Sequence, residues 1–269
     1  SRKQGPSFQD PADEKRPDEK ECQAFQIGEG ETRNDKIPMA QDHRDKDGTG
    51  KKPGARQVQD RQGPRSPRRA RRRGEREGKN PTKQTLRNAR ETAELARAFG
   101  APWIQGGLTD PPTAAVLENL RRAADIAREA GACLALEYLP FTPLRSIRDT
   151  LAAIDGAGVR DARVVVDTWH FFNGPETWAD LEALPLERLA YPQFDDAPEL
   201  VSDDLLYETT QRRVLPGEGH FDLTRFVRSL RDRGWDGPVS VELLSAEMRS
   251  WPREIFAKRV HAAARPYWS

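Results

Sequence analysis

The chain alternates between two hydrophobic patterns from residue 85 onward, and this alternation limits the fold more than any other feature. Apolar residues three and four positions apart predict amphipathic helices at residues 85–100, 114–131, 143–158, 222–234 and 252–264. Short apolar runs predict strands at residues 101–107, 133–140, 162–167, 187–196 and 237–245. Strands that are separated by helices pair in parallel through right-handed crossovers. The sequence therefore predicts an α/β domain whose parallel sheet is covered by helices.

Residues 1–81 differ in composition from the rest of the chain. Their few large apolar side chains, such as Phe8, Phe25 and Ile27, lie among many charged, glycine, proline and glutamine residues. A segment of this kind cannot bury enough apolar surface to offset the entropy that it loses on ordering. We therefore expect residues 1–81 to be disordered, without a strand or helix of their own, and residues 82–269 to form the folded domain.

An arginine run lies inside this segment, with six arginines between residues 65 and 73. Such a run can bind phosphates through charge alone, with an affinity that falls steeply as salt rises. It has no interleaved aromatic residues that could stack on bases, and blocks of like charge are commonly solvated tails. We expect no specific nucleic-acid partner.

The positions of the two cysteines and the hydropathy of the chain indicate the cellular compartment in which we expect the protein. Cys22 and Cys133 lie on opposite sides of the predicted boundary, which disfavours a disulfide framework. No apolar run is long enough to span a membrane, and the first residues do not form a signal peptide. We expect a cytoplasmic protein with no membrane partner.

Polar side chains stand near the carboxyl ends of four consecutive predicted strands: Glu137, Asp167, Gln193 and Glu242. In a (β/α) barrel the carboxyl ends of all strands meet at one face, where the catalytic groups gather. Carboxylate and amide oxygens are the ligands that Mg²⁺ and Mn²⁺ prefer, and three buried carboxylates would be too costly without a cation. The sequence predicts a divalent-metal site with Mn²⁺ or Mg²⁺ as the cofactor.

Each of these residues also has a simpler interpretation. A glutamate after a strand, such as Glu137, is commonly a helix cap or a surface charge, and Asp167 could cap the turn that follows it. Gln193 could be an ordinary loop amide. The succession of four oxygen-bearing side chains at consecutive strand ends favours a shared site over four separate roles.

Four motifs follow one another after residue 85: LALEYLP, VVDTWHF, RVLPGEGHFDL and GWDGPVSVELLS. In this order they resemble the xylose isomerase-like TIM-barrel superfamily, specifically its sugar phosphate isomerase/epimerase group. The resemblance implies a TIM barrel with metal ligands at Glu137, Asp167, Gln193 and Glu242. It also implies that His170 and Arg213 contact substrate oxygens.

The same resemblance implies proton transfer next to a carbonyl, with an enediolate that the metal stabilises. Glu137 and Glu242 are then the predicted catalytic groups, which remove one proton and return another. Return to the opposite face of the same carbon inverts that centre, and return to the neighbouring carbon converts an aldose to a ketose. Glu218 is predicted to orient Arg213. The expected partner is a small polyhydroxy carbonyl substrate, and a homo-oligomer stays open.

Two further functions stay open. Many members of the superfamily have His where Gln193 stands, and the amide resembles the 3-dehydroshikimate dehydratases, which are lyases. The barrel also looks incomplete, because only five strands are predicted where the family has eight. We hypothesise that residues 1–81 replace the first βα units, which leaves a non-catalytic barrel remnant as the other alternative.

Overall fold

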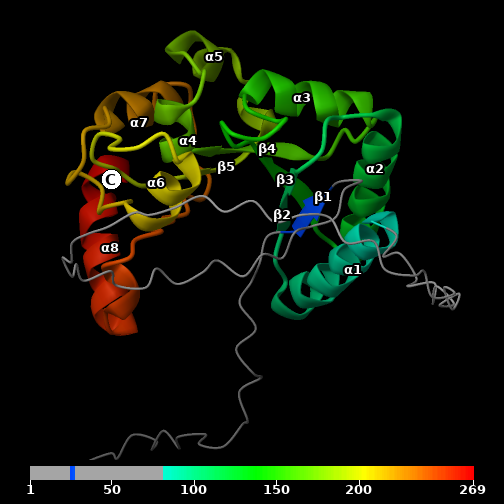
Figure 1. Ribbon diagram of the computed structural model, residues 1–269, viewed down its shortest axis with the longest axis horizontal. Helices are drawn as coiled ribbons and strands as arrows, with labels where there is room; N and C mark the ends of the chain where they lie inside the picture. Colours follow the sequence, from blue (N-terminus) through cyan, green and yellow to red (C-terminus); the bar gives the residue numbers. More distant parts are fainter. Residues whose placement is uncertain (1–24, 28–80) are drawn as a thin grey trace, which may run out of the picture.

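A computed structural model describes residues 25–27 and 81–269 of the chain, shown as coloured ribbon in Figure 1. The predicted disorder of the N-terminal segment falls on residues that, apart from 25–27 and 81, lie outside this description, and so does the arginine run.

The described residues form an α/β fold around one parallel sheet, as the sequence predicts. Its five strands follow one another in the order β1-β2-β3-β4-β5, with every neighbouring pair parallel. The strands are β1 (Phe25–Ile27), β2 (Trp103–Leu108), β3 (Cys133–Glu137), β4 (Arg163–Asp167) and β5 (Leu189–Gln193). The α-helices are α1 (Pro81–Phe99), α2 (Ala114–Glu129), α3 (Ile147–Gly156), α4 (Thr168–Asn173), α5 (Trp178–Ala183), α6 (Leu205–Gln211), α7 (Leu223–Arg231) and α8 (Arg253–Trp268). Short 3₁₀ helices lie at Leu186–Arg188 and Met248–Ser250.

The long helices form where apolar residues recur at helical spacing. In α1, Leu86, Ala89, Ala93 and Ala96 are buried, but Phe99, three residues further along the chain, is 75% exposed. The reason is its position as the last residue of the helix, where the chain turns away at Gly100 with a φ of 63°. No helix among the described residues has both the length and the apolar character needed to cross a membrane.

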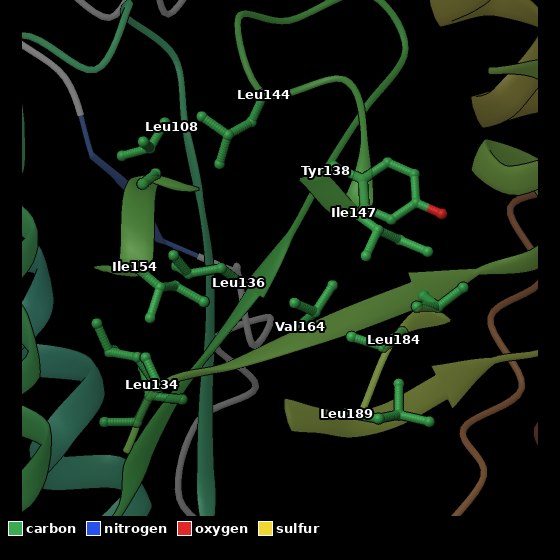
Figure 2. Packing of buried hydrophobic residues seen from close by; sticks show 14 of the residues in the cluster. Leu108, Leu134, Leu136, Tyr138, Leu144, Ile147, Ile154, Val164, Leu184 and Leu189 are labelled. Carbon is green, nitrogen blue, oxygen red and sulfur yellow. The ribbon is translucent and has the colours of Figure 1, made fainter. Parts of the chain in front are cut away.

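The side chains of each strand alternate between two faces of the sheet. Leu134, Leu136 and Val164 are fully buried in the main core, together with residues of the covering helices such as Ile154 (Figure 2). We call this side the outer face. The opposite side, which we call the inner face, carries a second, smaller cluster that includes Ala135, Val165 and Ala190. Residues at odd positions of β3 and β4 therefore point away from the main core.

Two differences from the sequence prediction concern the strands. A strand was not expected in the N-terminal segment, yet Phe25–Ile27 pairs with Gly106–Leu108 of β2. Conversely, the run at 237–245 is not a strand and meets β5 only through a parallel bridge between Gln193 and Ser240.

Competition between backbone partners explains the second difference. Ser240 exchanges hydrogen bonds with the β5 side of the sheet, through Phe194 N (2.8 Å) and Pro192 O (3.0 Å). A few residues later the chain bonds elsewhere, because Arg213 N donates to Leu244 O at 3.3 Å and Ala246 N donates to Gln211 O at 2.9 Å. The prediction of a strand at 237–245 is therefore wrong, because this run meets the sheet at one bridge only.

Candidate metal centre

Three potential metal ligands gather where β3 and β4 end. Glu137 is the last residue of β3, Asp167 is the last residue of β4, and His170 lies in the first turn of α4. One ligand atom from each lies within 4.8 Å of the other two. Glu137 is partly buried, whereas Asp167 and His170 are each about 1% exposed. Alternation along the strands places both carboxylates on the inner face, at its carboxyl end.

Asp167 also caps the helix that carries His170. Its Oδ1 accepts a hydrogen bond from His170 N at 2.9 Å, which satisfies one of the free N–H groups of the first turn. The interpretation of Asp167 as a cap is therefore confirmed, and its role as a metal ligand stays a prediction. The cap brings the imidazole back toward the strand end, with Nε2 3.2 Å from Glu137 Oε1 and 3.9 Å from Asp167 Oδ1.

Gln193 supplies a further oxygen on the neighbouring strand. It is the last residue of β5, pairs in register with Asp167 and is 3% exposed. Its Oε1 is buried and has no hydrogen-bond partner among the described residues. A buried acceptor without a partner costs roughly 1–3 kcal/mol, and a bound cation would remove that cost.

Arg213 lies at the centre of the remaining charges. Its Nη1 donates to Asp167 Oδ2 (2.7 Å), to Asp195 Oδ2 and, at 3.4 Å, to Glu242 Oε2. Its Nε and Nη2 donate to the carbonyl (3.0 Å) and the hydroxyl (2.8 Å) of Thr209. The side chain is fully buried. Glu242 is thus connected to the three-residue group through Arg213.

The role expected for Glu218 is wrong. Glu218 is exposed in the loop that follows Arg213, while the guanidinium bonds to Asp167, Asp195, Thr209 and Glu242. Carboxyl groups within hydrogen-bond distance, such as those of Asp167 and Asp195, are much stronger partners for a buried guanidinium than a solvated loop glutamate is.

The buried charges set each other's protonation. Burial alone would raise the pKa of Asp167, but the charges of Arg213 and His170 and the hydrogen bonds from both residues together outweigh it and hold this pKa below its ordinary value. Burial raises the pKa of Asp195 well above its ordinary value, and the negative charge of Asp167 adds to the rise. Burial, followed by the charges of Asp167 and Glu137, raises the pKa of Glu242 to about 7. The carboxyl group of Asp167 therefore loses its proton at lower pH than that of Asp195.

Sequence reasoning missed the acidic pair that follows β5. Asp195 is fully buried and accepts from Thr168 Oγ1 at 3.0 Å, in addition to Arg213. Asp196 is buried too, and its carboxylate accepts from Gly217 N and Gly219 N at 3.0 Å each. The signal was two aspartates directly after an apolar strand, which a surface loop rarely requires.

This donor set fits a divalent cation. Two carboxylates, an imidazole and an amide oxygen offer ligands that Mg²⁺, Mn²⁺ and Zn²⁺ accept in different proportions. Of the four predicted ligands, Glu137 and Asp167 lie together, Gln193 is the register neighbour of Asp167, and Glu242 is held by Arg213. His170, predicted as a substrate contact, stands among the ligand candidates.

Comparison with known proteins places the chain in a family. The profile of the xylose isomerase-like TIM barrel matches residues 74–261. A solved structure described as an IOLI protein with a bound zinc atom superimposes with a TM-score of 0.60, at 19% identity, over 70% of each chain. At this identity the superposition shows the shared fold.

Two enzymes of known name match parts of the sequence. An inosose isomerase from Halalkalibacterium halodurans is 27% identical over 119 residues, which are 44% of this chain and 41% of the relative. A 3-dehydroshikimate dehydratase from Pseudomonas aeruginosa is 30% identical over 89 residues, which are 33% of this chain and 14% of the relative. The chain thus matches less than half the length of either relative.

Proposed function

Because this chain belongs to the xylose isomerase-like TIM-barrel family, we propose that it is a divalent-metal-dependent enzyme that isomerises or epimerises a small polyhydroxy carbonyl compound. The observation that carries the proposal is the group of Glu137, Asp167 and His170 at the ends of β3 and β4. The relative named as an inosose isomerase supports the reaction type.

The residues that would hold the ion are Glu137, Asp167 and Gln193, with Glu242 and His170 beside them. One structural neighbour contains zinc, but the oxygen-rich donor set of this chain favours Mn²⁺ or Mg²⁺. A bound ion supplies positive charge beside a substrate carbonyl, which stabilises the negative charge that develops when a neighbouring carbon loses its proton.

Glu137 and Glu242 are the proposed proton-transfer groups. They reach the centre from different elements, Glu137 from β3 and Glu242 from the extended segment after α7. The side chain of Glu242 is 33% exposed, so it stays within reach of a bound molecule. One carboxylate can remove a proton from carbon, and the other can return a proton to the same or the neighbouring carbon.

His170 and Arg213 support these carboxylates in different ways. His170 Nε2, 3.2 Å from Glu137, can donate a hydrogen bond to that carboxylate or to a substrate oxygen. All three side-chain nitrogens of Arg213 bond to protein atoms. We therefore propose that Arg213 acts on the substrate indirectly, because it fixes the positions of Asp167 and Glu242.

A lyase is the second candidate, favoured by Gln193 and by the match to a 3-dehydroshikimate dehydratase. In this reaction the same proton abstraction is followed by loss of a β-hydroxide. The aromatic product would absorb in the ultraviolet, whereas a sugar product would not. A non-catalytic remnant is the third candidate, and it predicts neither hydrogen exchange nor a cooperative melting transition.

The test is exchange of substrate α-hydrogen into deuterated water, followed by NMR over a panel of aldoses, ketoses and cyclic polyhydroxy ketones with Mn²⁺ present. Glu242→Gln should lower the exchange rate by about two to four orders of magnitude, because the amide cannot accept a proton. The matched control is Glu247→Gln, which changes an exposed glutamate close by in the chain. Exchange at the parental rate in Glu242→Gln would remove Glu242 from the mechanism.

Asp167→Asn separates metal binding from proton transfer. This variant should mainly weaken Mn²⁺ binding in calorimetric titration, and excess Mn²⁺ should restore part of its exchange activity. A parent protein that neither binds Mn²⁺ nor exchanges hydrogen would rule out the proposed function.

A further inference from the structure

A hydrogen-bonded pair of side chains lies beside Glu137 and has no role in the function proposed above. Tyr191 OH, on β5, donates to Gln105 Oε1 at 2.6 Å. Gln105 Nε2, on β2, donates in turn to Glu137 Oε2 at 2.9 Å. The three residues form one chain of hydrogen bonds, which we call the inner-face relay, and all three are partly buried.

The order of donors in the relay fixes the Gln105 amide. A phenol hydroxyl has one hydrogen to donate, and here it points to the amide oxygen, so the amide NH₂ group faces Glu137. The reverse amide orientation would place two acceptors, Gln105 Oε1 and Glu137 Oε2, against each other. The carboxylate of Glu137, which can only accept, therefore fixes which end of Gln105 it meets, and the Tyr191 hydroxyl holds the other end of the amide by donating to Oε1.

The relay also separates the two oxygens of Glu137. Oε2 is held by Gln105, while Oε1 lies 3.2 Å from His170 Nε2. Rotation of the carboxylate would break the Gln105 bond, so that Oε1 stays directed at the group formed with Asp167 and His170. A ligand carboxylate that is fixed before an ion arrives loses less freedom on binding.

Small inner-face residues allow the relay to cross the sheet. Gln105 lies on β2 and Tyr191 on β5, with β3 and β4 between them. Ala135 of β3 pairs in register with Gln105, and Val165 of β4 pairs in register with Tyr191. Both intervening side chains are buried in the inner-face cluster against which Tyr191 packs. Their small size leaves room for a glutamine to meet a tyrosine above them.

We propose that Gln105 and Tyr191 are positioning residues, which orient the Glu137 carboxylate for metal binding. This inference rests on the proposed function, because it assumes that Glu137 is a ligand. It assigns Gln105 the direct contact and gives Tyr191 a role that operates only through Gln105.

The experiment titrates Mn²⁺ by calorimetry into the full chain and into the variants Gln105→Met, Tyr191→Phe and the double variant. Gln105→Met should weaken Mn²⁺ binding about tenfold to a hundredfold, the usual effect of losing a hydrogen bond to a metal ligand. Tyr191→Phe should have a smaller effect. The double variant should bind no more weakly than Gln105→Met alone, since Tyr191 has nothing left to orient.

Thermal melting without metal separates positioning from a structural role, because positioning predicts weaker Mn²⁺ binding with little change in melting temperature. The matched control is Tyr138→Phe, which removes a buried hydroxyl that has no partner among the described residues, one position beyond Glu137. Its Mn²⁺ affinity should equal that of the parent.

The outcomes are distinct. A parent that binds no Mn²⁺ overturns this inference, and a parent that also exchanges no hydrogen overturns the proposed function as well. A parent that binds Mn²⁺, with Gln105→Met binding equally well, overturns the inference alone. If Gln105→Met fails to fold, Tyr191→Phe decides, and an affinity equal to that of Tyr138→Phe overturns the relay.

Discussion

The two faces of β3 and β4 differ in chemistry although they share one backbone. On the outer face, Leu134, Leu136 and Val164 are fully buried against helices. On the inner face, the same strands carry alanine and valine at their centres and end in Glu137 and Asp167. Because side chains alternate along a strand, each short run holds the fold with one set of residues and presents the site with the other.

The two faces are stabilised by different interactions. The outer face is stabilised by apolar burial, which is distributed over many residues. The inner end depends on charge pairing, which concentrates on Arg213 because its Nη1 contacts three carboxylates. Loss of one residue should therefore matter more at the inner end than on the outer face.

The largest expected effect comes from Arg213→Met. It leaves the ionised Asp167 buried without its cation, a change that typically costs about 3–5 kcal/mol of unfolding free energy. The control, Arg121→Met, breaks an exposed helix pair with Glu118 and should change the unfolding free energy far less. Urea denaturation measures both. If the two variants lose equal stability, the charge at the inner end does not support the fold.

The pH dependence of this loss has a definite sign. Burial raises the pKa of Asp167, but the charges and hydrogen bonds of Arg213 and His170 together bring it below its unfolded value, so this pairing contributes stability above the unfolded pKa. That contribution disappears as pH falls through the folded pKa. The gap between the parent and Arg213→Met should therefore narrow in acid.

The second expected effect tests the outer face. Leu136→Ala removes a fully buried side chain from the main core and should cost about 3 kcal/mol through lost burial and the cavity that remains. Mn²⁺ affinity should stay within a fewfold of the parent's, because Leu136 points away from the inner face. A large loss of Mn²⁺ affinity at unchanged fold would show that the two faces are coupled.

The sequence predicted these two faces unevenly. Hydrophobic periodicity was enough to predict helices α1 and α2 and strands β2 to β5. The end of each apolar run was enough to predict that Glu137 and Asp167 lie at the carboxyl ends of their strands. The three-residue β1 carries no pattern of its own and exists only through its pairing with β2. The inner-face relay could not be predicted from the sequence either, because Tyr191 and Gln105 lie 86 positions apart. Contacts that depend on how the sheet curves leave no local signal.

The smallest expected effect concerns Glu176, a partly buried carboxyl near the N-terminus of α3, where it accepts a hydrogen bond from Ile147 N. Burial raises its pKa to about 7, although this hydrogen bond opposes the rise. A carboxyl whose pKa is raised by folding costs nothing below the unfolded value of about 4.5, and its cost is complete above the folded value. The free energy of unfolding should therefore fall as pH rises from about 4.5 to about 7.

The variant Glu176→Gln keeps an oxygen for Ile147 N but cannot ionise. After allowance for solvent screening, its unfolding free energy should exceed the parent's by about 1–2 kcal/mol at pH 8 and match it near pH 4.5. Urea titrations across this range measure the difference, with the exposed Glu182→Gln as the control. A difference that is the same at every pH would mean that Glu176 does not titrate in this window.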